Sequence, residues 1–234
     1  MSRVLAIGDL HEPVSHPGYL AFCRDLYREF RCDSAVLLGD VADWHAISFH
    51  DKEPECPGSA DEYEQAKAKI KLWHGAFPKA RVCIGNHDCR PQRLAKTRGI
   101  PERFLKGYNT LWETPGWTWD YSFLIDGVYY CHGTGTSGVH PAWNKSGKML
   151  MSVVLGHCHA RAGIKWRVNP LQRVFAMDVG CGIDNDAFQF VYGKENDDKP
   201  ILAAAVILDG EPAHRMMPMG KGEKYHKSKF KGAK

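Results

Sequence analysis

The sequence lacks the features that would indicate a membrane or secreted protein. Its longest apolar run, residues 201–208, is far short of the roughly 18–20 residues that a membrane span requires. Its 8 cysteines occur singly with no Cys-x-x-Cys pair, which argues against a cysteine-based structural zinc site. The Met-Ser-Arg start leads directly into a strand pattern without a signal-peptide pattern. We therefore expect reduced thiols, no membrane association and a cytoplasmic location.

The chain also has little net charge outside its last residues. The formal charge of the whole sequence is +4, but residues 219–234 contain six lysines against Glu223, a net of +5, which leaves −1 for residues 1–218. We expect residues 1–218 to form the folded domain. Residues 219–234 are too poor in apolar side chains to fold, so we expect a disordered basic tail. Such a tail would suit contact with nucleic acid.

Strand and helix patterns alternate in the first half of the chain. Buried-strand runs over 3–8, 34–39 and 80–85 each end in glycine. Pro17 suits the first position of a helix after the first strand. Ser59 with Glu62 forms a capping-box pattern that opens a second helix.

The second half of the chain is rich in strand patterns. Asp126-Gly127 and Asp209-Gly210 are two-residue hairpin signals. The strands expected around them cover residues 118–125, 128–132, 152–156, 163–168, 171–178 and 201–208. The sequence thus predicts an α/β (α+β) fold of a single domain, in which two packed mixed β-sheets form a sandwich flanked by helices.

Five polar clusters lie at or just after the ends of predicted strands, where ligands bind in sheets flanked by helices. Their side chains offer carboxylate, imidazole and amide donors, which suit Mn²⁺, Fe or Zn²⁺. Seven such residues are too many for one tetrahedral ion and about right for two ions that share a bridging carboxylate. The seven candidate ligands are Asp9, His11, Asp40, Asn86, His132, His157 and His159.

The order of these clusters is specific. Asp-x-His, Gly-Asp-x-x-Asp, Gly-Asn-His-Asp, a lone His and Gly-His-x-His follow one another between Asp9 and His159. In this order they resemble the calcineurin-like metallophosphoesterase superfamily. The resemblance implies two divalent metal ions, with Mn²⁺ favoured over Fe, Zn²⁺ or Ni²⁺. It also implies a phosphate-ester substrate and attack on phosphorus by a hydroxide that bridges the ions.

The resemblance also assigns roles to individual residues. The first ion would be held by Asp9, His11, Asp40 and His159, and the second by Asp40, Asn86, His132 and His157, so that Asp40 bridges. His87 matches the general acid of the family, and Asp43 matches the carboxylate that orients this histidine.

Two departures from the protein Ser/Thr phosphatases bear on the substrate. Those enzymes continue Gly-Asp-x-x-Asp with Arg-Gly, whereas Trp44-His45 follow Asp43 here, and their last motif lacks the second histidine, here His159. Both differences point toward phosphodiesterases, nucleotidases and Mre11-like nucleases. We therefore expect phosphodiester or nucleotide substrates. An Mre11-like nuclease or nucleic-acid-binding protein is the alternative, followed by a protein-binding scaffold without catalysis, although no ligand residue is missing.

Three residues beside the motifs allow two interpretations each. His45 and Arg90 are candidate substrate-binding residues, but a structural role is favoured for His45, and Arg90 can equally lie on a solvated helix face. Asp88 suits a helix N-cap or a hydrogen-bonding role at least as well as chemistry. The glycine-rich segment 133–138 can cradle phosphate or form a mobile loop over the site.

Overall fold

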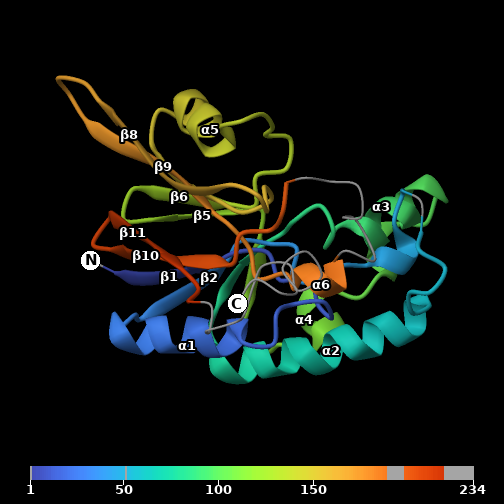
Figure 1. Ribbon diagram of the computed structural model, residues 1–234. Helices are drawn as coiled ribbons and strands as arrows, with labels where there is room; N and C mark the ends of the chain where they lie inside the picture. The colour runs from blue at the N-terminus through green and yellow to red at the C-terminus, as the bar shows by residue number, and fades with distance from the viewer. Residues whose placement is uncertain (1, 51, 189–197, 219–234) are drawn as a thin grey trace.

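Two mixed β-sheets pack face to face in a computed structural model that describes residues 2–50, 52–188 and 198–218 (Figure 1). The strands of the first sheet are, in spatial order, β11 (Glu211–Met216), β10 (Ala203–Leu208), β1 (Arg3–Ile7), β2 (Ser34–Leu37), β3 (Arg81–Cys83) and β4 (Thr118–Asp120). Those of the second are β5 (Ser122–Ile125), β6 (Val128–Cys131), β7 (Ser152–Leu155), β9 (Arg173–Val179) and β8 (Ala162–Val168). The fold predicted from the sequence is confirmed.

Helices cover the outer faces of both sheets (Figure 1). α1 (Tyr19–Glu29) and α2 (Ser59–Ala76) lie along the first sheet, and α5 (Pro141–Met149) lies on the second. The shorter helices are α3 (Arg90–Thr97), α4 (Tyr108–Trp112), α6 (Asn185–Phe188) and the 3₁₀ turns η1 (His45–Ile47) and η2 (Glu102–Phe104). Within the described ranges, no helix combines the length and the apolarity needed to span a bilayer.

The alternation of side chains along β1 explains the layers. Val4 and Ala6 belong to the apolar cluster between the two sheets, whereas Leu5 and Ile7 belong to the cluster under α1 and α2. Successive side chains of a strand point to opposite faces, so a strand buried on both faces is apolar throughout. Fully burying a side chain of this size contributes roughly 1.5–3 kcal/mol. The two layers therefore hold β1, and the loop after it, firmly in place.

The segment 118–125, predicted as one strand, is two strands in different sheets. Thr118–Asp120 pairs with β3 of the first sheet, and Ser122–Ile125 pairs with β6 of the second. The prediction of a single strand was wrong. Both halves have similar strand patterning, and this pattern does not indicate that the chain changes sheet between them. Tyr121 is the residue at which the chain passes between the sheets.

The two predicted helix starts also need correction. α1 begins at Tyr19, so Pro17 precedes the helix. Gly58 is the N-cap of α2, and no side chain caps this end, so the capping box is wrong. Glu62 is instead buried, and its carboxylate accepts the backbone N–H groups of His45 (2.6 Å) and Ala46 (2.9 Å). These bonds hold the chain just after Asp43, a contact that local sequence spacing does not reveal.

Both predicted hairpin turns are confirmed. Asp126-Gly127 joins β5 to β6, and Asp209-Gly210 joins β10 to β11. All four residues have positive φ, from 48° at Asp126 to 84° at Gly210, as a type I′ turn requires. The predicted basic tail, residues 219–234, lies outside the described residues.

Candidate functional site

Loops that follow strands of both sheets bring the seven candidate ligands into one cluster. The first sheet contributes the loops after β1, β2 and β3, and the second contributes those after β6 and β7. The cluster contains three overlapping groups in which the possible ligand atoms lie within 4.8 Å of one another. These groups are Asp9, His11 and His159; His11, Asp40 and His87; and Asp40, His132 and His157.

Asp40 lies between two sets of ligand atoms. On one side, His11 Nε2 is 3.5 Å from Asp40 Oδ2. On the other side, His132 Nε2 is 3.2 Å from the same oxygen and 2.9 Å from Asn86 Oδ1, while His157 Nδ1 lies 3.1 Å from His132 Nε2. One carboxylate oxygen is therefore shared by both sides of the cluster.

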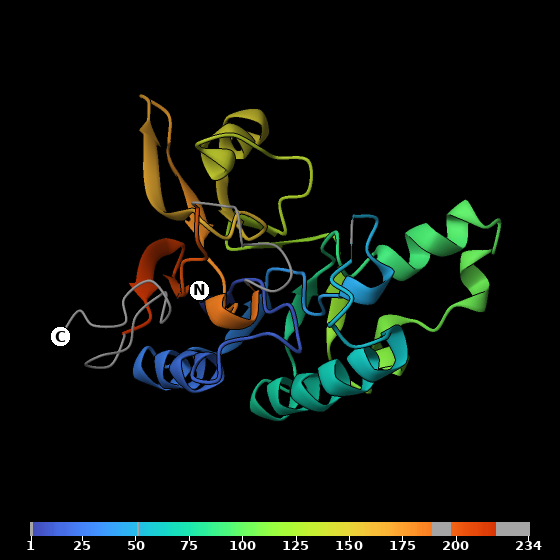
Figure 2. The same ribbon diagram turned by 45° about the vertical axis from the view of Figure 1, so that its right-hand side comes forward.

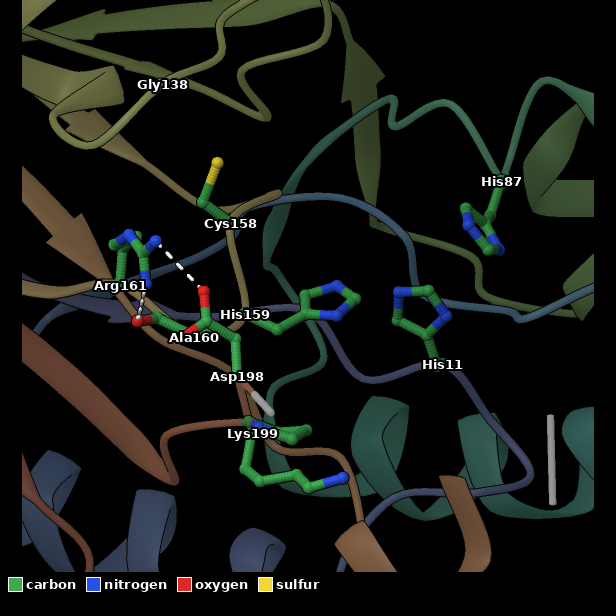
Figure 3. A pocket seen from close by; sticks show the side chains of 10 residues that line it. His11, His87, Gly138, Cys158, His159, Ala160, Arg161, Asp198 and Lys199 are labelled. Carbon is green, nitrogen blue, oxygen red and sulfur yellow. Dashed lines mark hydrogen bonds and ion pairs between the residues drawn. The ribbon is translucent and has the colours of Figure 1, made fainter. Parts of the chain in front are cut away.

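Asp9 belongs to the first of these sides. His159 Nε2 is 3.0 Å from Asp9 Oδ2, and the imidazole rings of His11 and His159 are 4.8 Å apart. Figure 3 shows these two rings side by side at the cavity wall. Asp9 also accepts the backbone N–H of His157 at 3.0 Å, which ties the loop after β7 to the loop after β1.

The backbone turns sharply at three of the ligands. His11, Asp40 and His157 have φ values of 49°, 47° and 67°. Positive φ is uncommon for residues other than glycine and concentrates at sites where the surrounding structure enforces it. Each turn follows shortly after a buried strand ends, and it directs the side chain into the cluster.

Two glycines make room for the buried carboxylates. A Cβ on Gly85 would lie 2.1 Å from Asp40 Oδ1, and a Cβ on Gly156 would lie 2.2 Å from Asp9 Oδ1. Real Cβ atoms essentially never approach other heavy atoms this closely. Both positions therefore require glycine because of the neighbouring carboxylate.

We expect Gly156→Ala to weaken metal binding and to lower turnover by about 10²-fold, since a displacement of about 1 Å is enough for such a loss. The measurement is bound metal by elemental analysis together with turnover of a phosphate ester. Gly75→Ala is the matched control, because a Cβ at Gly75 meets nothing within 4 Å. Equal metal content in both variants would contradict the assignment of Asp9 as a ligand.

Asp43 is positioned to orient two histidines. Its Oδ1 is 2.7 Å from His11 Nδ1 and 3.1 Å from His87 Nδ1, and its backbone oxygen is 2.7 Å from the same His87 nitrogen. Burial alone would raise the pKa of the Asp43 carboxyl, but the hydrogen bonds from His11 and His87 hold it well below its usual range. Asp43 therefore remains a carboxylate, and it fixes the Nδ1 side of both rings.

The cluster attracts positive charge. Burial disfavours a charge on His132, yet the carboxylates of Asp40 and Asp9 raise the pKa of this imidazole to about 10. His87 shows the same balance: burial opposes protonation, and the charge of Asp40 with the Asp43 contact raises its pKa. Carboxylate, imidazole and amide donors in a buried anionic cluster fit a divalent transition-metal ion.

Asp88 and Arg90 bind the backbone of the loops that carry the candidate residues. Asp88 does not cap α3, whose N-cap is Cys89; its carboxylate accepts the N–H groups of Val41 (3.0 Å) and Gly85 (2.9 Å). It thereby joins the loops that carry Asp40 and Asn86. Arg90 is only 4% exposed, so the solvated helix face is wrong.

Arg90 and His45 lie next to the Asp43 loop. The guanidinium of Arg90 donates to the backbone oxygens of Asp43 (2.7 Å) and Trp44 (3.0 Å), and one of its nitrogens is 3.1 Å from His87 Nε2. His45 is buried, and its Nε2 accepts the N–H of Glu53 at 2.9 Å. Arg90 thus borders the predicted acid directly, whereas His45 is tied into the adjoining loop.

A cavity of about 350 Å³ opens onto the cluster, with His11, His87 and His159 in its wall (Figure 3). Two cations that the sequence interpretation missed, Arg161 and Lys199, also line it. Arg161 forms an ion pair with Asp198 at 3.0 Å. The position of Arg161 two residues after His159 was an available signal. Lys199 had none, because it reaches the site from a distant part of the chain.

Comparison with solved structures finds several similar chains. Vacuolar protein sorting 29 from Cryptosporidium parvum has 13% identity and a TM-score of 0.44, with 92% of this chain and 96% of that chain covered. A metallophosphoesterase from Sphaerobacter thermophilus has 14% identity and a TM-score of 0.45, with 92% and 88% covered. Yfce, a phosphoesterase from E. coli, has 14% identity and a TM-score of 0.42, with 92% and 100% covered.

No curated protein matches the chain in sequence. A family description does match, however, and it confirms the resemblance seen in the ordered motifs. Residues 2–195 match the calcineurin-like phosphoesterases, and the chain belongs to this family.

Proposed function

We propose that the protein is a dinuclear metal-dependent phosphodiesterase in which His87 is the general acid. Family membership supports metal-dependent hydrolysis of phosphoesters. The observation that carries the finer proposal is the shared oxygen of Asp40, which lies 3.5 Å from His11 Nε2 and 3.2 Å from His132 Nε2. A carboxylate between two sets of donors is the arrangement that a pair of metal ions uses for phosphoryl chemistry.

The proposed ligand sets follow the two sides of the cluster. Asp9, His11, Asp40 and His159 would hold one ion, and Asp40, Asn86, His132 and His157 the other. Mn²⁺ is favoured, with Fe, Zn²⁺ and Ni²⁺ as alternatives. When bound, the ions supply an activated water and neutralise charge on the phosphate.

The chain's own residues supply the remaining steps. Arg161 and Lys199 stand in the cavity wall, where they suit the phosphate oxygens of a substrate. Asp43 accepts the N–H of His87 Nδ1, so Nε2 is the atom that would carry the proton to be donated. In the structure Nε2 accepts an N–H of Arg90 at 3.1 Å, so Arg90 has to turn away before this nitrogen takes up a proton. The positive charge of Arg90 also opposes protonation of His87, which favours release of the proton to the departing oxygen.

Two cavities favour a diester over a monoester. The cavity of about 350 Å³ borders His87, and a second cleft of about 1020 Å³ borders Asn86. A diester has two ester groups to accommodate on phosphorus, whereas a monoester has one.

The test compares bis(p-nitrophenyl) phosphate with p-nitrophenyl phosphate, each with Mn²⁺, Zn²⁺, Ni²⁺ or Mg²⁺. We expect kcat/KM for the diester to exceed that for the monoester by at least about tenfold, a difference of about 1.4 kcal/mol in the barrier. Mn²⁺ should give the highest rate, and removal of metal by a chelator should abolish it. Preference for the monoester would contradict the proposed bond type.

Binding of nucleic acid through residues 219–234 stays a prediction, as does the cytoplasmic location. Deletion of these residues should weaken binding to DNA or RNA and reduce its dependence on salt, because each lysine that contacts phosphate releases counterions. A scaffold without catalysis is disfavoured, since all seven ligand positions are filled by residues able to coordinate metal.

A further inference from the structure

The cleft of about 1020 Å³ adjoins the metal cluster at Gly85 and Asn86. Its walls come from the loop after β3, from α3 and the turn after it, from Tyr108 of α4 and from Tyr121. Ligand sites of about 300–1,000 Å³ hold molecules of drug size. The cleft is therefore large enough for a nucleoside with a phosphate group.

The position of His87 indicates which part of the substrate each cavity would hold. His87 lines the smaller cavity beside His11 and His159, whereas Asn86 lines the larger cleft. A general acid must reach the oxygen that departs. The leaving group therefore points into the smaller cavity, and the ester group that stays on phosphorus points into the cleft.

The wall of the cleft suits a planar ring with N–H groups. The ring of Tyr108 is stacked on Trp119, with centroids 4.6 Å apart, and Tyr121 is 68% exposed. Bases stack on such aromatic surfaces. The Gln92 side chain also lines the cleft; its Oε1 is buried and accepts no hydrogen bond from the part of the chain that the structure describes. An N–H of a bound base would satisfy this oxygen.

Two cations extend along the cleft away from the metal cluster. α3 begins beside His87, and Figure 2 shows this helix running away from the sheets. Arg93 and Lys96 lie on it, about 4.5 Å and about 9 Å beyond Arg90 at a rise of about 1.5 Å per residue. Both line the cleft together with one acid, Glu102, so the wall has a net positive charge. A second phosphate on the retained group would meet this charge.

We propose that the cleft binds the retained ester group of the substrate and that this group is a nucleoside bearing a further phosphate. The inference rests on the proposed phosphodiesterase function. In the reaction, a water oxygen bonds to phosphorus and the bond from phosphorus to the leaving oxygen breaks. The departing oxygen takes the proton of His87, and one proton of the water restores it. The nucleoside then leaves as a phosphate monoester.

Three p-nitrophenyl phosphodiesters with the same leaving group test this assignment with the full-length, metal-loaded protein. Their retained groups are methyl, thymidine linked through its 5′ oxygen, and the same thymidine with a 3′-phosphate. We expect kcat/KM to rise about tenfold from methyl to thymidine, within the range of about 5- to 150-fold that one stacked base contributes. The 3′-phosphate should raise kcat/KM about threefold further, because an exposed ion pair contributes little more than this.

Variants in the cleft identify where the gain arises. Tyr121→Ala should lower the thymidine-to-methyl ratio of kcat/KM about tenfold, and Arg93→Ala should remove the gain from the 3′-phosphate. Phe104→Ala is the matched control, since this exposed aromatic residue of η2 is not part of the cleft wall. It should leave both ratios unchanged.

Binding provides a readout that does not depend on turnover. Thymidine 3′,5′-bisphosphate should change the tryptophan fluorescence at a concentration at least about tenfold below that of inorganic phosphate, because Trp119 lies behind the stacking surface.

The outcomes separate the two proposals. Equal kcat/KM for all three esters would overturn the cleft assignment and leave the phosphodiesterase in place. A tyrosine variant that behaves like Phe104→Ala would also overturn it. Failure to cleave any of the three esters would overturn both.

Discussion

Asp40→Asn is expected to release bound metal and to lower kcat/KM by roughly 10³-fold, because the ions contribute several kcal/mol of charge stabilisation in the transition state. The substitution removes the negative charge and little else. Asparagine tolerates the left-handed backbone at this position, where φ is 47°. Its side-chain oxygen can still accept the backbone N–H of His87, whose nitrogen lies 2.7 Å from Asp40 Oδ1. Metal content by elemental analysis and kcat/KM for bis(p-nitrophenyl) phosphate measure the two effects.

The control for this variant is Asp25→Asn on α1, whose carboxylate is 78% exposed. It removes the same charge far from the cluster and should retain metal and activity. If Asp40→Asn lost one ion and kept the other, the shared position of Asp40 would be wrong. If it kept both ions and full activity, the proposed metal site would be wrong as a whole.

His87→Gln is expected to keep bound metal while losing about 10²–10⁴-fold of kcat on a substrate with an alkoxide leaving group. Glutamine retains a polar side chain but has no proton of suitable acidity to donate. The loss should depend on the leaving group, since p-nitrophenolate departs as a stable anion and gains little from protonation. A thymidine dinucleotide and bis(p-nitrophenyl) phosphate supply the two kinds of leaving group.

The leaving-group dependence distinguishes an acid from a metal ligand. His87 belongs to one of the groups of ligand atoms within 4.8 Å, together with His11 and Asp40, so a ligand role is a definite alternative. Loss of metal in His87→Gln, or an equal loss of rate on both substrates, would favour that role. His74→Gln on α2 is the control, because this side chain contacts Pro115 at 2.9 Å and lies outside the cluster.

The convergence of the ligands was predictable because it follows from strand direction. In parallel strands, the carboxyl ends meet at one edge of the sheet, so polar residues after buried runs collect there. Asp9, Asp40 and Asn86 follow three neighbouring parallel strands, and His132 and His157 follow two in the second sheet. The glycines that end these runs were visible too, although the carboxylate contacts of Gly85 and Gly156 were not.

The buried side-chain contacts that hold the backbone around Asp43 were not predictable from the local sequence pattern. Glu62 matched a capping box in sequence, yet its carboxylate binds the backbone after Asp43. Arg90 has the residue type of a solvated helix face, yet it is buried against the Asp43 carbonyl. Each contact joins segments far apart in the chain, and such pairs depend on the packing of whole elements. For the same reason the cleft beside Asn86, formed by four separate segments, had no sequence signal.

The division of the proposed ligands between the two sheets would give bound metal a mechanical role. Asp9, His11 and Asp40 come from one sheet, and His132 and His157 come from the other. Ions coordinated by both sets would cross-link the two sheets, so the protein could unfold only if it released the ions. Stability then grows with the free metal concentration by mass action. The fraction of the protein that is folded would then depend on the free metal concentration around it.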